Sequence, residues 1–443
     1  MNTPIADFVR AYADDNPCRL HMPGHKGSGP VGCEKFDITE VKGADALYEA
    51  EGIIAESEAN ATALFGSGRT VYSTEGSSQC IRAMLYLALT NRTAEMSPVI
   101  VAARNVHRAF VYAAALLDVE VVWLWPEERQ SLCSCPITAE NLEKTLSELS
   151  TPPAAVYITS PDYLGEMADV AGLANVCHRH GTILIVDNAH GAYLRFLPQS
   201  MHPLDFGADL CCDSAHKTLP VLTGGAYLHI SKALPDSFRE NAKIAMAMFG
   251  STSPSYLTLM SLDLCNQTLA ESAPAQLEVF LQKLERTRMD LTNRGWQLKE
   301  TDPLRITVLM PKGLNGIKQA EKMRRGTLEC EYADREHLVM MMTPWNEVRT
   351  PRYIVVNMEA NERPPTEPKQ LPLAKGEQVC SIRQALFAPR ETIPVKEALG
   401  RVCGAPTVSC PPAIPIVVSG ERIGKEALRL FSHYRVKTVD VLK

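Results

Sequence analysis

The sequence predicts an α/β protein with a mostly parallel β-sheet flanked by helices. Between residues 57 and 218, short apolar segments alternate with segments of helical periodicity, which is the pattern of parallel strands joined by crossover helices. The 443 residues are 45% hydrophobic and 22% charged, as in ordinary globular proteins. This composition excludes disordered, collagen-like and coiled-coil chains.

The N-terminal half of the chain contains the predicted sheet. Its first sixty residues are rich in Gly, Pro, His and acidic side chains and predict an ordered but irregular arm. A helix then ends at Gly66, a strand follows at 69–74, and a second helix begins near Ser77. Further apolar strands are expected at 99–103, 119–124, 155–159, 183–187 and 210–213. A helix is expected between two of them, at 170–181.

The second half predicts smaller units. Residues 263–299 have the periodicity of one long amphipathic helix or of two helices, and strands are expected at 305–310 and 338–344. A Pro-rich linker at 362–372 leads to a small tail with an apolar run around 414–418. The expected domains are an arm at 1–60 that lines the active site, a large cofactor-binding domain at 61–262, a connecting helix with a small domain at 263–361, and the linker with a smaller α+β C-terminal domain at 362–443.

Charge and terminal sequence exclude several classes of partner. With 45 basic and 51 acidic side chains the formal net charge is −6, and no polybasic patch is available for nucleic acid or anionic lipid. The N-terminus lacks the basic start and the apolar run of a signal peptide. The longest apolar stretch, 109–125, is interrupted by Asp118 and Glu120, whereas a bilayer span needs about 18 apolar residues. We expect a cytoplasmic protein that binds neither nucleic acid nor membrane.

The cysteines and histidines predict no metal site. The 13 cysteines are scattered and odd in number, which favours reduced thiols over a disulfide framework. His21 and His25 have the spacing of helical metal ligands, but Pro23 between them prevents that helix. Cys133 and Cys135 have no second ligand pair with matching spacing.

A lysine and an aspartate follow two of the predicted buried strands. Lys217 lies in the segment Asp213-Ser-Ala-His-Lys-Thr218, where burial would lower the pKa of its amine and make it nucleophilic, as Schiff-base chemistry requires. Asp187 ends the strand at 183–187, where a carboxylate can keep a pyridine nitrogen protonated. The alternatives are a surface-loop lysine and a helix-capping aspartate.

Two further segments complete the pattern of a cofactor site. Ser77 and Ser78 open a helix after a strand, where hydroxyls and free backbone N–H groups form a phosphate cradle, although the same residues are also a common helix cap. His107 follows the strand at 99–103 and, taken alone, is more simply a loop histidine. The order and spacing of cradle, histidine, aspartate and lysine together predict a pyridoxal-phosphate site.

Longer motifs containing these residues extend over nearly the whole chain. They are Leu20-His-Met-Pro-Gly-His-Lys-Gly27, Asp37-Ile-Thr-Glu40, Gly43-Ala-Asp45, Gly76-Ser-Ser78, Arg104-Asn-Val-His107, Thr159-Ser-Pro-Asp-Tyr-Leu-Gly165, Asp187-Asn-Ala-His190, Ser214-Ala-His-Lys217, Ser251-Thr-Ser-Pro-Ser-Tyr256 and Cys410-Pro-Pro-Ala-Ile-Pro415. In these motifs the chain resembles the ornithine/lysine/arginine decarboxylase family of fold type I pyridoxal-phosphate enzymes. The resemblance implies an aspartate-aminotransferase-like large domain with a seven-stranded type of sheet, in the short form without an N-terminal wing domain. Ala413 and Glu166 depart from the usual pattern.

The resemblance implies how the cofactor would be held. Lys217 would bind pyridoxal phosphate as a Schiff base, Asp187 would pair with the pyridine nitrogen, and His107 would stack on the ring. The residues implied to contact or flank the phosphate are Ser77, Ser78, Ser214 and His216, with Thr252 or Ser253 reaching it from a neighbouring subunit.

The resemblance also implies how the substrate would be bound. His190 would lie near the ring hydroxyl or the substrate carboxylate, and Lys217 or His216 would donate a proton to Cα. The distal cation of a basic amino acid needs a carboxylate partner. The candidates are Glu166, Glu40 and Asp45, with solvated loop charges as the alternative. Family members are at least dimers with the site at the subunit interface, so a homodimer or a larger assembly is expected.

The function expected from this resemblance is decarboxylation of arginine, lysine or ornithine to the amine and CO₂, a reaction of polyamine biosynthesis. One alternative with the same cofactor is an aminotransferase or another lyase, in which Arg349 or Arg352 could bind the substrate carboxylate. Another is a catalytically inactive regulatory homologue, against which the intact Lys217, Asp187 and His107 argue.

Overall fold

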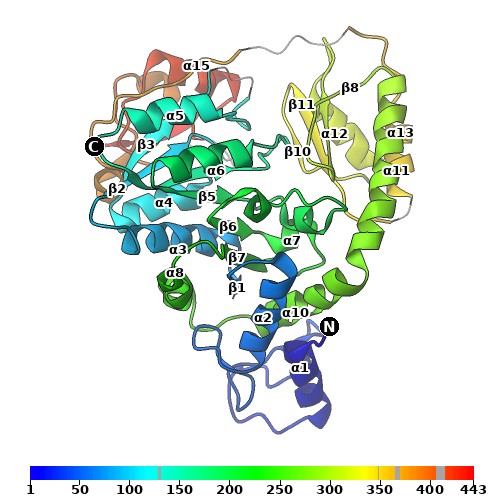
Figure 1. Ribbon diagram of the computed structural model, residues 1–443. Coiled ribbons are helices and arrows are strands. Elements are labelled where there is room, and N and C mark those ends of the chain that lie inside the picture. The colour runs from blue at the N-terminus through cyan, green and yellow to red at the C-terminus, as the bar shows by residue number, and fades with distance from the viewer. Residues whose placement is uncertain (128–130, 348, 365–369, 406–414) are drawn as a thin grey trace.

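The computed structural model describes residues 1–127, 131–347, 349–364, 370–405 and 415–443. Figure 1 shows a large α/β domain, a small domain beside it, an N-terminal arm below and a C-terminal domain that packs on the large domain. Among the described residues, no helix combines the length and apolar character that a bilayer crossing requires.

A seven-stranded sheet forms the centre of the large domain, in the order β1-β7-β6-β5-β4-β2-β3. The pairs among β2 to β6 are parallel, and β7 runs antiparallel to both β6 and β1, so the predicted mostly parallel sheet is confirmed. The strands are β1 Arg69–Ser73, β2 Ser97–Ala103, β3 Glu120–Leu124, β4 Pro153–Thr159, β5 Ile183–Asp187, β6 Leu210–Asp213 and β7 Ala226–Ile230.

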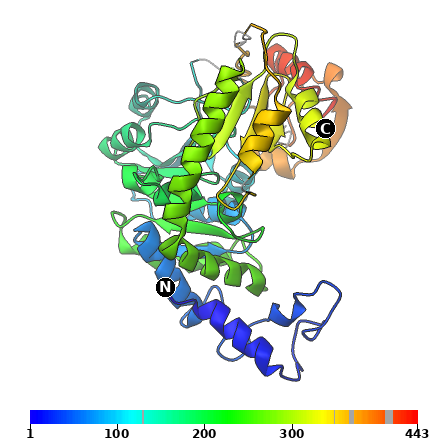
Figure 2. The ribbon, with the colours of Figure 1, turned by 90° about the vertical axis from the view of Figure 1, so that its right-hand side faces the viewer.

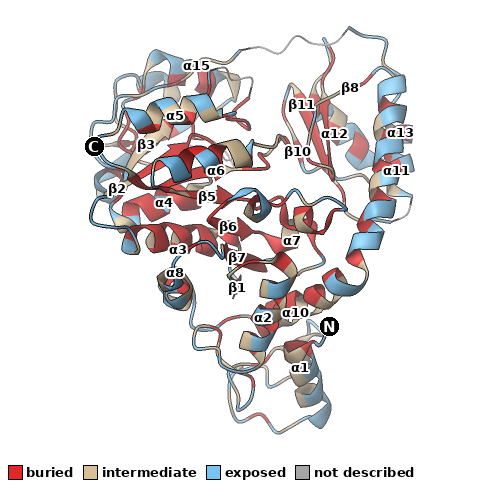
Figure 3. Cartoon of the chain, viewed as in Figure 1, coloured by how far each residue is buried: buried red, intermediate tan, exposed pale blue. Residues whose placement is uncertain are grey.

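Helices cover both faces of this sheet because successive side chains along each strand point to opposite faces. In β2, Ile100 and Ala102 pack in the cluster that includes α3 and α4, whereas Val101 and Ala103 pack with α5 and α6. These four helices are α3 Ser77–Thr90, α4 Arg108–Leu117, α5 Ala139–Ser147 and α6 Val170–Arg179. The central strands are therefore buried on both sides (Figure 3).

The arm contains more regular structure than its composition predicts. It forms α1 (Pro4–Asp15), the 3₁₀ turn η1 (Glu34–Phe36) and α2 (Ile53–Phe65). The expectation of an irregular segment is therefore wrong for α1, which buries Ile5 and Val9 against α2 and α10. Figure 2 shows the arm projecting from the body of the molecule.

Short helices and then two long ones lead from the large domain to the small one. The region 263–299 predicted one helix or two, and the structure has two, α10 and α11, with Pro274 near the N-terminus of the second. The elements are η2 Ala192–Phe196, η3 Pro203–Phe206, α7 Ala215–Thr218, α8 Asp236–Glu240, α9 Ala242–Ala247, α10 Tyr256–Glu271 and α11 Ala273–Asn293.

The small domain contains an antiparallel sheet in the order β10-β11-β9-β8. Its central strands β9 and β11 lie where strands were predicted at 305–310 and 338–344. The elements are β8 Gln297–Leu298, β9 Arg305–Leu309, α12 Gly316–Arg325, β10 Tyr332–Ala333, β11 His337–Met341 and α13 Thr350–Asn357.

The C-terminal domain is a small α+β unit with its own apolar core, in which β12 pairs antiparallel with β13. Much of the predicted linker, together with residue 414 of the apolar run and Ala413, lies outside the described residues, and residues 415–418 are buried without forming a strand. The elements are α14 Ile382–Phe387, β12 Arg390–Pro394, η4 Val395–Glu397, α15 Lys425–His433 and β13 Thr438–Leu442.

Candidate active site

A cavity of about 480 Å³ opens where the carboxyl ends of the parallel strands face the small domain. Ligands of open α/β sheets bind at this edge. The lining residues come from the ends of β4 and β5, the segments after each of the strands β2 to β6, the start of α3, and the small domain. They are Ser77, Asn105, His107, Cys133, Thr159, Pro161, Tyr163, Asp187, Ala189, His190, His216, Lys217, Glu331 and Met341.

Lys217 lies in the single turn of α7 that directly follows β6, and its Nζ is 3.1 Å from Nε2 of His190. Burial lowers the pKa of the Lys217 amine, while the negative charge of Asp187 opposes this shift. Burial, with the positive charge of Lys217 as the next cause, holds the pKa of His190 well below its ordinary value. The pair therefore favours a neutral imidazole beside an amine that loses its proton readily.

Asp187 ends β5 and is buried at the cavity wall. The Tyr157 hydroxyl donates to its Oδ2 at 3.0 Å, and the Ala189 amide donates to its Oδ1 at 3.2 Å. These bonds hold the carboxylate in one orientation, in which it can accept a hydrogen bond from a ring N–H in the cavity.

His107 is the N-cap of α4, where its Nδ1 accepts the amide of Ala109 at 3.2 Å. Burial lowers the pKa of His107, with the charge of Asp187 opposing. The ring is therefore neutral with its proton on Nε2, and it can lie against a flat aromatic ligand.

The predicted phosphate residues meet at the N-terminus of α3. Gly76 precedes this helix with φ of 74°, a left-handed conformation that glycine adopts without strain. Ser214 donates a hydrogen bond to the Ser77 hydroxyl at 2.8 Å, and the backbone N–H of His216 donates to the carbonyl of Gly225. Hydroxyls and helix amides are thus close together, as phosphate binding requires.

Four of the predicted cofactor residues do not line this cavity, and one of them is Ser214, although it bonds to Ser77. Ser78 is the second residue of α3 and is only partly buried, and Thr252 and Ser253 are exposed in the turn before α10. The amide of Ser251 donates to the Glu75 carboxylate, which places that turn beside the segment preceding α3. Contact between this turn and the phosphate of a neighbouring subunit stays a prediction.

The three carboxylates predicted to bind the substrate also lie outside the cavity wall, and each has other contacts. Glu166 pairs with Lys299 at 3.1 Å and lines a smaller cavity of about 100 Å³. Asp45 accepts backbone N–H groups of the loop before α2 and of its first turn, including those of Gly52 and Ile54. Glu40 accepts the hydroxyl of its neighbour Thr39.

The family model for the Orn/Lys/Arg decarboxylase major domain matches residues 3–315 of this chain. The chain belongs to the Orn/Lys/Arg decarboxylase family. The resemblance of its motifs to that family is confirmed, the protein is a decarboxylase, and its cofactor is pyridoxal phosphate.

Relatives of this decarboxylase align over nearly its whole length. The uncharacterized protein YaaO of Bacillus subtilis is 27% identical over 98% of this chain and 94% of its own. The arginine decarboxylase of Bacillus subtilis is 26% identical over 96% of this chain and 92% of its own. The crystal structure of the Francisella novicida lysine decarboxylase LdcF has the same fold, with a TM-score of 0.82 at 15% identity over 100% of this chain and 81% of that chain.

The cavity of the decarboxylase fits the cofactor on structural grounds. Lys217 supplies an amine with a lowered pKa, Asp187 an oriented carboxylate, and the start of α3 a phosphate cradle. Nε2 of His190 lies 3.1 Å from the Lys217 amine in the cavity wall, so this imidazole can form a hydrogen bond with a group that enters there.

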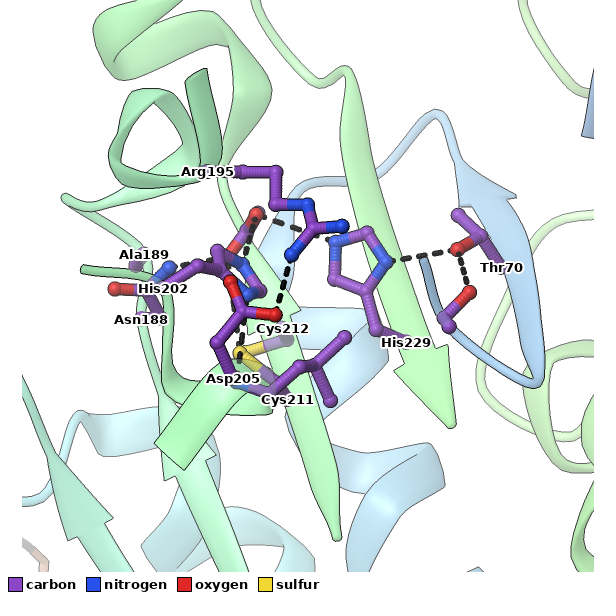
Figure 4. A network of polar contacts seen from close by, with 12 residues as sticks. Thr70, Asn188, Ala189, Arg195, His202, Asp205, Cys211, Cys212 and His229 are labelled. Carbon is purple, nitrogen blue, oxygen red and sulfur yellow. Dashed lines mark hydrogen bonds and ion pairs between the residues drawn. The ribbon is translucent and has the colours of Figure 1, made fainter. Parts of the chain in front are cut away.

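A buried polar network holds the segments that carry these residues (Figure 4). Asp213, the last residue of β6, accepts from Nε2 of His202 at 3.1 Å and of His229 at 3.2 Å, and from Asn188 at 2.6 Å. Burial raises the pKa of Asp213, but the two histidines outweigh it and hold that pKa well below its usual range. Since Asn188 directly follows Asp187, the network fixes the end of β5 against the end of β6.

Part of this network also has the composition of a metal site, because ligand atoms of His202, Cys211 and Asp213 lie within 4.8 Å of one another. However, Nδ1 of His202 accepts the amide of Leu204, so its Nε2 carries a proton towards Asp213. Hydrogen bonds therefore account for this arrangement.

Sequence reasoning assigned no role to two polar cavity residues that contact each other, Glu331 and Tyr163. Glu331 lies next to the short strand β10 in the small domain and accepts the Tyr163 hydroxyl at 2.8 Å. Tyr163 in turn packs edge-on against His190, with ring centroids 5.4 Å apart. Tyr163 belongs to a motif noted in the sequence, but no local pattern around Glu331 distinguishes it from a surface carboxylate.

Proposed function

We propose that this decarboxylase acts on a basic amino acid, arginine, lysine or ornithine, and releases the corresponding amine and CO₂. The observation that carries the proposal is the position of Glu331 in the wall of the cavity that also contains Lys217 and Asp187. Its charge acts on the Lys217 amine, whose pKa it raises. A carboxylate at this place can bind the distal ammonium or guanidinium of the substrate.

The cofactor supplies an electron sink for the electron pair that loss of CO₂ leaves at Cα. Asp187 keeps the ring nitrogen protonated, and His107 covers the ring face. His190, whose Nε2 lies 3.1 Å from Nζ of Lys217, would lie near the ring hydroxyl or the substrate carboxylate. Lys217 would hold the cofactor through its amine and release it when the substrate amine binds, and Lys217 or His216 would return a proton to Cα.

The positions of Arg349 and Arg352, which could bind the substrate carboxylate in an aminotransferase, do not support transamination. Arg349 caps α13 and Arg352 lies within it; both side chains are exposed, and neither lines the catalytic cavity. A substrate carboxylate bound to either arginine would lie away from Lys217.

The assembly that we propose is a homodimer or a larger homo-oligomer. The projecting arm exposes three apolar side chains, Leu20 at 92%, Met22 at 69% and Val31 at 78%. Apolar side chains gathered on one projecting segment favour burial against another surface, and a second copy of the chain is the proposed partner.

The test of the reaction is mass spectrometry of the products after incubation of the protein and pyridoxal phosphate with arginine, lysine and ornithine together. We expect agmatine, cadaverine or putrescine from the wild type, and no amine from Lys217→Ala, which lacks the nucleophilic amine. A keto acid product, or no product from the wild type, would contradict the proposal.

A further inference from the structure

A buried ion pair joins the C-terminal domain to the catalytic cavity. Nη1 and Nη2 of Arg104 donate to Oε1 and Oε2 of Glu421, each at 2.7 Å, and the two residues are 317 positions apart in the chain. Each residue is only 1% exposed. Two parallel hydrogen bonds between a planar guanidinium and a carboxylate fix both the separation of the two groups and their relative orientation. A single hydrogen bond does not fix the orientation.

Neighbouring groups hold both halves of this pair. The Arg104 guanidinium lies 4.7 Å from the ring centroids of both Trp123 and Trp125. The Glu421 carboxylate also accepts the amide of Val418 at 2.8 Å. The pair is therefore part of a rigid contact between the segment that follows β2 and a turn of the C-terminal domain.

A second contact holds the other end of the same segment. Helix α14 of the C-terminal domain packs on α4, and Arg383 donates to the carbonyls of Ala115 at 3.0 Å and Leu116 at 3.2 Å, at the end of α4. The segment from Arg104 to the end of α4 is thus held at its start and at its end by one domain.

That segment carries two residues of the cavity wall, Asn105 and His107. Within the described parts of the chain, neither forms a hydrogen bond or an ion pair with the C-terminal domain. We propose that Glu421 is a positioning residue, which acts through Arg104 to hold Asn105 and His107 in the orientation that the cofactor ring requires. The inference rests on the proposed function, because it assigns His107 to the ring face.

The test compares Glu421→Gln with Glu391→Gln. Glu391 also pairs with an arginine of the C-terminal domain, Arg401 at 2.6 Å, but that pair is partly exposed and does not touch the cavity. In Glu421→Gln we expect amide hydrogen exchange in residues 104–110 to rise at least about tenfold at a temperature where the sheet stays protected. We also expect affinity for pyridoxal phosphate, followed by the visible circular dichroism of the bound cofactor, to fall at least about tenfold. Glu391→Gln should match the wild type in both measurements.

A second variant covers the case in which Glu421→Gln does not fold. Arg104→Lys keeps the opposite charges but loses the two-bond geometry, so it should fold and show the same rise in exchange. A Glu421→Gln or Arg104→Lys protein that melts earlier, yet keeps wild-type exchange in residues 104–110 and wild-type cofactor affinity, would overturn the proposal. Hydrogen exchange needs no substrate, so this result is independent of whether any basic amino acid is decarboxylated.

Discussion

Glu331 contacts Tyr163, whose ring packs against His190, so one carboxylate of the small domain is linked to Lys217 through two side chains. Its neighbour Glu329 has the same chemistry but pairs with Arg324 on the surface, outside the catalytic cavity. The two residues therefore form a matched pair for separating substrate binding from general charge effects.

Replacement of Glu331 by Gln should raise KM for the preferred basic amino acid about 10- to 100-fold, because a hydrogen bond to a charged group contributes about 1.5–3 kcal/mol. Cofactor affinity should stay unchanged, and Glu329→Gln should behave as the wild type. Steady-state kinetics on the substrate identified by product analysis provides the measurement. An unchanged KM for Glu331→Gln would remove Glu331 from the substrate site.

Asp162 predicts a pH dependence of stability. Burial raises its pKa from 3.8 to about 6. Between these values the folded protein binds more protons than the unfolded chain, so the free energy of unfolding falls as pH rises through this window. The loss is complete above about pH 6 and amounts to about 3 kcal/mol.

Asp162→Asn removes this titration and retains an oxygen that can accept the amides of Leu164 and Glu166. We expect the variant to become more stable relative to the wild type as the pH rises from 4.5 to 7.5, because only the wild type loses stability over this range. Urea unfolding at the two pH values gives the measurement. Asp169→Asn, at the exposed cap of α6, is the control and should keep the wild-type dependence. Equal differences at the two pH values would show that Asp162 does not titrate in this range.

At the scale of elements, the network around Asp213 holds β5 and β6 together at their catalytic ends. Asp213→Asn should lower the free energy of unfolding by about 3–5 kcal/mol, because an amide cannot accept from His202, His229 and Asn188 at once. Asp205→Asn removes a partly exposed partner of Arg195 and should cost about 1 kcal/mol or less. Chemical denaturation of both variants gives the comparison, and equal losses would show that the network contributes no more than a surface pair.

The parallel strands could be predicted because each contains a short apolar run, and β4, β5 and β6 also end at a polar residue. That pattern also located Asp187 and Lys217, since residues at the carboxyl ends of parallel strands converge on one edge of the sheet. Helix α1 was missed although Ile5, Phe8, Val9 and Tyr12 have helical spacing, because the Gly- and Pro-rich residues that follow dominate the composition of the arm. Glu331 could not be predicted, because a turn of the small domain brings it to the cavity from more than one hundred residues away in sequence.

At the scale of the whole molecule, the exposed apolar side chains of the arm allow a test of the proposed homo-oligomer. The chain mass is 48.7 kDa, and light scattering should give twice that value or a higher multiple. Replacing Leu20 and Val31 together by Ser should weaken the assembly, because burial of one such side chain contributes about 1.5–3 kcal/mol. Leu399→Ser, at an exposed site of the C-terminal domain, should leave the mass unchanged. A wild-type monomer across the concentration range would contradict the proposed homo-oligomer.

The Arg104–Glu421 pair has a consequence for synthesis of the protein on the ribosome. Translation at roughly 10 residues per second leaves about half a minute between the appearance of the arginine and that of its partner 317 positions later. During that interval the sheet, Lys217 and Asp187 can already be in place. The segment that carries His107 still lacks its ion pair with Glu421. A nascent chain that stops before Glu421, through a premature stop codon, would therefore contain Lys217, Asp187 and His107 but lack the contact that we propose to position His107.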